Sequence, residues 1–300
     1  MRTKRFGKTE IDRVEENGRF LFQPHMLFIG TDVEFTKRHK QSLGERIIDN
    51  ETSSFVISFH SFVVRANGKV ILVDTCNGNH KERYGLPWQH KLASDNYIKN
   101  LKKVGLTPED IDLVMCTHLH GDHIGWNTYL VNGRWKPTFP NARYIMSQQD
   151  YGFFESQNRE LVDGKPKHLA FADSILPIAE AGLIDCIDIL TTPMLQIADG
   201  VTVEAAVGHT VGTVLMRVEG GRDSGYLTGD IIHHPIQFLV PDLINPGDQD
   251  PVAARKTRDE LIVRIANEGA MLLPAHFPDP SAGRIFRKPE GGYRFEFEAE

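Results

Sequence analysis

The hydrophobic positions from residue 55 onward predict β-strands separated by turns and helices. Residues 55–64 (FVISFHSFVV) are rich in β-branched and aromatic side chains, and residues 69–74 (KVILVD) form a second apolar run after a turn at 66–68. These two runs predict a hairpin. Apolar residues at helical spacing then predict a helix over 94–105, and the short run LVMCT at 113–117 predicts a further strand.

The second half of the chain repeats this mixture. Three strand-like runs, an amphipathic helix and a last apolar strand are predicted at 201–207, 213–218, 225–230, 252–268 and 271–276. Because the strands come in runs with helices between them, the pattern indicates an α+β fold rather than a doubly wound nucleotide-binding fold. No glycine-rich phosphate loop follows any predicted strand, so the sequence gives no support to a dinucleotide or nucleoside triphosphate site.

Composition and charge narrow the possible partners. The 300 residues include 34 Lys and Arg against 40 Asp and Glu, for a net charge of −6. A chain that neutralises many phosphates is usually basic, so we expect no nucleic acid partner. Cys76, Cys116 and Cys186 are too few and too scattered for a disulfide framework. No stretch is apolar enough for a signal peptide or a membrane span, so we expect a soluble, cytoplasmic protein without a membrane partner.

A dense group of histidines follows the third predicted strand. It reads THLHGDH over residues 117–123. Residues i and i+2 of an extended segment point the same way, so His118 and His120 can hold one metal ion. Asp122 and His123 project differently and can hold a second ion nearby. Imidazole and carboxylate ligands suit zinc, and also iron or manganese.

Three further candidate ligands lie at or just after predicted strands. His209 follows an apolar strand and adjoins Gly208, which lets the backbone come close. Asp230 ends the run GYLTGD, where a carboxylate can bridge two ions, and His276 ends the run MLLPAH. Each of these residues alone is more often structural than a ligand. Together with the first cluster they favour a two-metal site.

The segment HLHGDH, followed in order by a Gly-His, a Gly-Asp and an Ala-His, resembles the metallo-β-lactamase superfamily of metallohydrolases. The resemblance covers about residues 55–277. It implies a four-layer αββα sandwich with the metal ions at one edge, between the sheets. It also implies a catalytic domain over residues 55–300. Residues 1–54, with charged runs around the apolar island LFQPHMLFIG, are then an N-terminal extension that can act as a lid or a dimer arm.

The same resemblance assigns roles to the candidate ligands. The family pattern implies two ligand sets that share a bridging carboxylate: His118, His120 and His209 for metal one; Asp122, His123 and His276 for metal two; and Asp230 between them. Asp74, at the end of the second predicted strand, matches the aspartate that orients the metal loop without ligating. A turn residue at a strand end is the alternative for Asp74.

Residues around these motifs indicate a branch of the superfamily. True zinc β-lactamases usually carry Cys or Ser at the position of Asp230, which disfavours antibiotic hydrolysis. Only 24 residues follow His276, too few for the thiol-binding domain of glyoxalase II-like thioesterases. The segments DLVMCTHLHGDHIGWNT and GDIIHHPIQF are similar to quorum-quenching N-acyl homoserine lactonases and to related organophosphate hydrolases. The lactonases place a tyrosine where this chain has His233, whereas the organophosphate branch has a histidine there.

The resemblance implies a binuclear metal-dependent hydrolase that opens a small-molecule lactone or carboxylic ester through attack of a metal-bridging hydroxide. Asp122 would take and return the proton, and His233 would donate a hydrogen bond to an oxyanion or a leaving oxygen. The expected cofactors are two divalent ions, zinc first, with manganese, iron or cobalt as alternatives. A phosphotriester or aryl-ester hydrolase of the same fold is an alternative function, and an iron-dependent oxidoreductase is another. Homodimerisation through residues 1–54 is a further hypothesis.

Three tryptophans near the metal motif are candidates for the wall of a substrate pocket. They are Trp88, Trp126 and Trp135, with packing in the core as the alternative for each. Trp126, three residues after His123, is the best of these candidates. His168 is expected to be a surface, turn or core residue, and we assign it no role.

Overall fold

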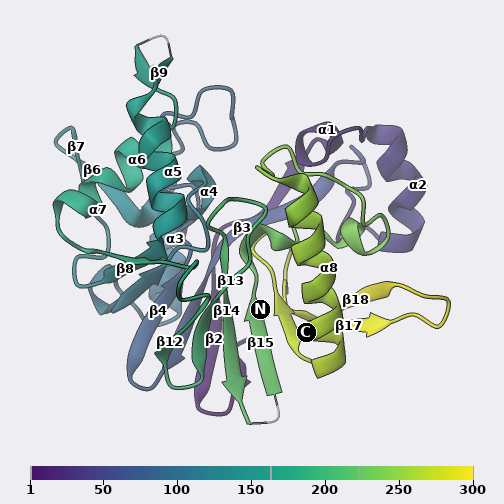
Figure 1. The fold of residues 1–300 in the computed structure, drawn as a ribbon. Helices are drawn as coiled ribbons and strands as arrows, with labels where there is room; N and C mark the ends of the chain where they lie inside the picture. The colour runs from purple at the N-terminus through teal and green to yellow at the C-terminus, as the bar shows by residue number, and fades with distance from the viewer. Residues whose placement is uncertain (1, 163, 222, 300) are drawn as a thin grey trace.

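Two seven-stranded β-sheets lie face to face in the computed structural model, which describes residues 2–162, 164–221 and 223–299 (Figure 1). The first sheet consists, in spatial order, of β1 (Lys4–Phe6), β2 (Thr9–Phe22), β3 (Phe55–Ala66), β4 (Lys69–Val73), β5 (Leu113–Met115), β8 (Arg143–Ser147) and β11 (Ile184–Ile187). Strands β4, β5, β8 and β11 are parallel to one another, whereas β1 to β4 pair in antiparallel fashion.

The second sheet follows chain order. It consists of β12 (Met194–Ala198), β13 (Val201–Ala205), β14 (Val214–Gly220), β15 (Asp223–Leu227), β16 (Met271–Leu273), β17 (Gly283–Arg287) and β18 (Tyr293–Phe297). Its pairs are antiparallel except for β15 with β16. Two hairpins lie outside the sheets: β6 (Thr128–Val131) with β7 (Arg134–Pro137), and β9 (Leu161–Val162) with β10 (Lys165–Pro166).

The helices lie between the strands along the chain. The α-helices are α1 (Pro24–Leu27), α2 (Val33–Leu43), α3 (Asn96–Lys103), α4 (Gly121–Ile124), α5 (Gln148–Arg159), α6 (Leu169–Ser174), α7 (Leu176–Glu180) and α8 (Pro251–Glu268). Short 3₁₀ turns are η1 (Pro108–Asp110), η2 (Gly125–Asn127), η3 (Gly229–Ile231) and η4 (Pro235–Phe238). The strands and helices predicted from residue 55 onward are all present, with ends shifted by a few residues.

Neighbouring residues of the first sheet face two different cores. Val63 on β3 packs in a cluster with Leu101 of α3 and Phe154 of α5. The next residue, Val64, packs in a second cluster with Met216 of the opposite sheet. Successive side chains of a strand point to opposite faces, so a sheet buried on both faces needs apolar residues at nearly every position. This explains why β3 is buried along nearly its whole length and is apolar at most of its positions.

The second sheet is covered in the same way by α8. Leu272 packs with Ile265 of α8, whereas its neighbour Leu273 packs in the cluster between the sheets. Helix α8 begins where the Asp250 side chain accepts hydrogen bonds from the first backbone N–H groups, and it ends at Gly269, whose φ is 60°. The order of layers is therefore helix, sheet, sheet, helix, which confirms the predicted αββα sandwich.

The N-terminal segment takes part in the first sheet. Strand β2 pairs with β3 from Glu10 opposite Arg65 to Phe22 opposite Phe55. The following residues, including α1, pack in a hydrophobic cluster with the start of β3. Residues 4–22 therefore contribute two strands to the sandwich, ahead of the predicted domain start at residue 55. A role for residues 1–54 in dimerisation stays a prediction.

The strand directions bring the candidate ligands to one edge of the sandwich. Asp74 follows β4, the metal loop follows β5, Asp230 follows β15, and His276 follows β16. Because β4 and β5 are parallel, as are β15 and β16, the carboxyl ends of each pair lie side by side. His209 lies between β13 and β14 at the same edge. The fold thereby collects residues that are up to 202 positions apart (276 − 74).

Candidate metal centre

Asp74 holds the metal loop in place. Its Oδ1 accepts a hydrogen bond from the backbone N–H of Thr117 at 2.7 Å, and its Oδ2 accepts one from the Thr117 hydroxyl at 2.8 Å. Oδ2 also lies 2.9 Å from Nδ1 of His123. A carboxylate can only accept from this ring nitrogen, so Nδ1 carries a proton and Nε2 is the nitrogen that faces Asp230. Asp74 thus contacts both the loop and one imidazole, the position that the resemblance implies for an orienting aspartate.

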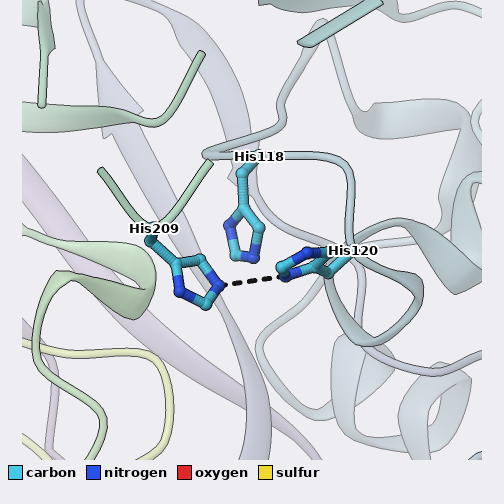
Figure 2. A group of neighbouring side chains, drawn as sticks. All are labelled: His118, His120 and His209. Carbon is cyan, nitrogen blue, oxygen red and sulfur yellow. Dashed lines mark hydrogen bonds between the residues drawn. The ribbon is translucent and has the colours of Figure 1, made fainter. Parts of the chain in front are cut away.

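Three imidazoles form the first ligand group. The ring nitrogens of His118, His120 and His209 lie within 4.8 Å of one another. Figure 2 shows the three rings converging from two separate segments, with Nδ1 of His120 3.0 Å from Nε2 of His209. Next to His209, a Cβ atom on Gly208 would lie 2.2 Å from the backbone nitrogen of Ala254, so only glycine fits there.

The second group consists of Asp122, His123 and His276. Their ligand atoms also lie within 4.8 Å of one another. Oδ2 of Asp122 is 3.7 Å from Nε2 of His276 and 3.9 Å from Nε2 of His123. Nδ1 of His276 donates a hydrogen bond to the carbonyl oxygen of Ser58 at 3.1 Å, which directs its Nε2 toward the group.

Asp230 lies between the two groups, with one oxygen toward each. Its Oδ1 is 3.0 Å from Nε2 of His276 and 3.3 Å from Nε2 of His123. Its Oδ2 is 3.5 Å from Nε2 of His209 and 3.9 Å from Nε2 of His118. The seven residues predicted as ligands are therefore brought together in the structure.

Burial and nearby charges together set the protonation of this cluster. For His123 and His276, burial favours the neutral ring, but the nearby carboxylates, Asp230 first, outweigh it and raise the pKa. For His118 and His120, burial lowers the pKa well below the usual imidazole value, and the neighbouring imidazoles add to the effect. Both rings are therefore neutral bases, as metal ligation requires. For Asp230, burial favours the protonated acid, but His123 and the other nearby imidazoles outweigh it and hold the pKa well below its usual value. The carboxylate is ionised.

Several polar atoms of the cluster have no hydrogen-bond partner within the described part of the chain. They are Nε2 of His118, Nε2 of His123, Oδ1 of Asp230 and both ring nitrogens of His233. Buried polar atoms in proteins nearly always have a hydrogen-bond partner, so these atoms are available to coordinate a ligand. Neutral imidazole nitrogens with two carboxylates form the donor set that binds zinc and similar divalent ions. The residues present therefore fit metal ions.

Asp248 is a member of the cluster that the sequence did not indicate. Its Oδ1 accepts a hydrogen bond from Nδ1 of His209 at 2.8 Å, and its Oδ2 accepts one from the backbone N–H of Asn245. With His209 and His233 it forms a further group of close potential ligands. Asp248 lies in an irregular loop before α8, and no motif or spacing marks it in the sequence.

His233 lies beside the first ligand group. Its Nε2 is 3.4 Å from Oδ2 of Asp230, and its ring centre is 4.9 Å from that of His209. It is buried, yet it lines a cavity that opens onto the cluster. This position lets it contact a substrate at the cluster without belonging to either group of three ligands.

A cavity of about 840 Å³ opens onto the cluster. Its apolar lining includes Phe22, Met26, Leu27, Ile57, Phe59, Leu86, Trp88, Val162 and Leu169. Trp126, the tryptophan favoured from the sequence, lies instead in the core, where it stacks on Tyr97 and donates a hydrogen bond to Glu16. Trp88 is the tryptophan of the cavity wall. The N-terminal segment supplies Phe22, Met26 and Leu27 to this lining, and its role as a lid stays a prediction.

The sequence matches the Metallo-beta-lactamase superfamily over residues 60–276. This match spans more than two thirds of the chain, and it includes all seven candidate ligands in the observed cluster. The chain belongs to the metallo-β-lactamase superfamily, as its motifs predict.

Two lactonases are similar to part of this chain in sequence. The chain is 31% identical to the N-acyl homoserine lactonase AiiB of Agrobacterium fabrum over 133 residues, and 32% identical to AiiB of Rhizobium rhizogenes over 124 residues. These matches cover 41% of both this chain and the first relative, and 38% of both this chain and the second. The aligned region thus spans less than half the length of either lactonase.

Solved structures share the fold over nearly the whole chain. The hydrolase AbOPH of the β-lactamase superfamily superposes with a TM-score of 0.79 at 22% identity, covering 99% of this chain and 97% of that one. AidC, a dizinc quorum-quenching lactonase in complex with a product, has a TM-score of 0.79 at 21% identity, covering 100% and 97%. In the described residues, none of the helices has the length and apolar character needed to cross a membrane.

Proposed function

We propose that this protein is a binuclear metal-dependent hydrolase that opens a lactone or a carboxylic ester. The observation that carries the proposal is the division of Asp230 between two ligand groups, with Oδ1 near His123 and His276 and Oδ2 near His118 and His209. A carboxylate in this position would be shared by two ions. The match of the chain to the metallo-β-lactamase superfamily supports a metal site here.

The two groups would hold one divalent ion each, and zinc is the proposed metal because neutral imidazoles dominate the donor set. His118, His120 and His209 would hold the first ion, and Asp122, His123 and His276 the second. When bound, such a pair of ions acidifies water and polarises the substrate carbonyl. Asp74 and Asp248 would keep the imidazoles of His123 and His209 in the ligating tautomer.

Two side chains have the reach to act on the reacting atoms. Asp122 lines the cavity and is the least buried member of its group, so its Oδ2 can take a proton from the attacking water and return it to the leaving oxygen. His233 also lines the cavity, and neither ring nitrogen has a partner in the described structure. A neutral imidazole N–H at this position would donate to the oxyanion or to the leaving oxygen.

The cavity supports a substrate with an apolar arm. Its aromatic and aliphatic wall lies beside the ligand cluster, and such a wall binds an acyl chain or an aryl ring by excluding water. The two similar proteins are N-acyl homoserine lactonases, so a medium-chain lactone of this kind is the first substrate to test.

A phosphotriester or aryl-ester hydrolase is the second candidate. The observation that favours it is His233. The lactonases that this sequence resembles carry a tyrosine at this position. The two candidates share the same metal site and differ in the group that leaves.

The decisive experiment measures proton release on addition of N-hexanoyl homoserine lactone, with metal content determined on the same sample. Rapid ring opening that chelation abolishes and zinc restores would support the lactonase. A fully metallated protein that leaves the lactone intact would contradict it. Paraoxon and phenyl acetate, assayed in parallel, would then test the second candidate.

A further inference from the structure

One wall of the cavity is polar and contains a carboxamide without a partner. Gln89 is only 5% exposed, and it lines the cavity beside Gly121 and Asp122 of the metal loop. Its Oε1 atom is buried and accepts no hydrogen bond within residues 2–162, 164–221 and 223–299. A buried polar atom without a partner costs free energy, so such atoms are uncommon in parts of a protein that serve packing alone.

Arg83 lies close to the acceptor end of this carboxamide. Its guanidinium forms a two-pronged ion pair with Asp173, with Nη1 2.6 Å from Oδ2 and Nη2 2.8 Å from Oδ1. Such a pair fixes the plane of the guanidinium. The remaining donor, Nε–H of Arg83, is also buried and unpaired among the described residues.

Arg83 Nε and Gln89 Oε1 converge at the first turn of α4. A Cβ atom on Gly121 would lie 2.8 Å from Gln89 Oε1 and 3.0 Å from Arg83 Nε. Because Nε–H is a donor, the acceptor end of the carboxamide belongs on the Arg83 side. The NH₂ end of Gln89 is then left for the cavity, next to the residues that would hold the second ion.

His168 places a second donor on the same wall. Its Nδ1 accepts a hydrogen bond from the backbone N–H of Phe171 at 3.2 Å, so the proton of the neutral ring is on Nε2. Burial lowers the pKa of His168 to about 4, which keeps the ring neutral at pH 7. His168 and Gln89 both line the cavity, whose other wall is apolar.

We propose that Gln89, oriented by Arg83 and Asp173, donates a hydrogen bond from Nε2 to an amide carbonyl oxygen of the substrate, with His168 as a second donor to the same region. The assignment rests on the proposed hydrolase function and narrows its substrates. It selects lactones or esters that carry an amide close to the scissile carbonyl and an apolar chain beyond it.

The test compares two lactones on the same protein preparation. N-hexanoyl homoserine lactone carries the amide, and a γ-alkyl butyrolactone of matched chain length lacks it. We expect Gln89→Leu to lower the ratio of kcat/KM for the amide lactone over the alkyl lactone by about three- to tenfold, the effect of one hydrogen bond to a neutral acceptor. Gln89→Glu should lower the ratio further, because a carboxylate would replace the donor with acceptors.

Matched controls make the result specific. Gln196→Leu, on an exposed position of β12, should leave the ratio unchanged. The ratio does not depend on how much of a variant is folded or metallated, since both lactones meet the same sample. Affinity for the product N-hexanoyl homoserine, measured by calorimetry, should fall by the same factor in Gln89→Leu.

Two results would overturn the assignment. An equal loss of kcat/KM on both lactones in Gln89→Leu would mean that Gln89 does not bind the substrate amide. A wild-type ratio in Gln89→Glu would mean that Gln89 is not a hydrogen-bond donor to the substrate. A metallated wild-type protein that hydrolyses neither lactone would remove the proposed lactonase function itself, before any variant is compared.

Discussion

Oδ1 of Asp248 lies 2.8 Å from Nδ1 of His209, the imidazole that closes the first ligand group. The pKa of Asp248 is below its usual value: burial favours the acid form, but the hydrogen bond from His209 and nearby charges outweigh it. An ionised carboxylate at Nδ1 keeps the proton there and leaves Nε2 free to ligate.

Asp248→Asn should therefore weaken metal binding without removing a ligand. We expect the affinity for the more weakly held zinc ion to fall by about 10- to 100-fold, the usual effect of an outer carboxylate on a ligating histidine. Competition with a chromophoric chelator measures this affinity directly. Asp199→Asn, at an exposed turn, is the matched control and should bind zinc as the wild type does. Unchanged affinity in Asp248→Asn would show that His209 does not need this carboxylate.

Substitutions of Asp230 and of His233 should differ in their effects: the first should reduce metal content as well as rate, and the second should change only the kinetics. Asp230→Asn removes the charge between the two groups, so we expect it to lose at least one ion and to lower kcat/KM by more than about a hundredfold. His233→Ala leaves both groups of three ligands intact, so it should retain its metal and change the rate or the choice of substrate. Elemental analysis beside steady-state kinetics distinguishes the two. Loss of metal from His233→Ala would contradict the role proposed for this residue.

Lys81 should make the stability of the protein depend on pH. Burial lowers the pKa of Lys81 to about 7 from a usual value of 10.5, although Asp173 opposes the shift. Between these two values the unfolded chain binds more protons than the folded one, so this lysine makes the folded state more stable as the pH rises from about 7 to 10.5. The slope from one such group is at most about 1.4 kcal/mol per pH unit.

Lys81→Met provides the comparison. Urea denaturation of wild type and variant at several pH values between 6.5 and 9.5 gives the difference in free energy of unfolding, and we expect this difference to change with pH in the stated direction. The contacts of the ammonium group, with the Thr128 hydroxyl at 2.6 Å and the Trp135 ring at 3.6 Å, place it in a fixed pocket. A difference that stays constant with pH would show that Lys81 keeps its ordinary pKa in the fold.

Glu16 should be essential for stability. This buried residue of β2 accepts hydrogen bonds from the backbone of Asn77 and Gly78 and from the indole of Trp126. Glu16→Ala leaves these buried donors without a partner, so we expect a loss of about 2–4 kcal/mol, measured by thermal or urea unfolding. Glu10→Ala on the same strand, where the side chain is partly exposed, should cost much less. Similar losses in the two variants would show that Glu16 does not anchor the loop before the metal site.

Much of this architecture is determined locally. The strand-forming residues of β3 and the helical spacing of residues 252–268 depend only on neighbours in the chain, and both elements form where predicted. Four candidate ligands lie within six consecutive residues: His118, His120, Asp122 and His123. One short loop therefore determines how these side chains project. These local patterns explain why the strands, the helices and the candidate ligands could be predicted from the sequence, whereas the four-layer sandwich was implied by the resemblance to the superfamily.

The tertiary structure decided what depends on the path of the chain between distant segments. Nothing around Asp248 marks it in the sequence, and it reaches His209 only because its loop returns across the edge of the second sheet. Trp126 lies close to the ligands in sequence but packs inward on Glu16, whereas Trp88, farther away in sequence, reaches the cavity. Local propensity acts over a few residues, but partners in space depend on how whole strands pair, and that pairing is settled only when the core packs.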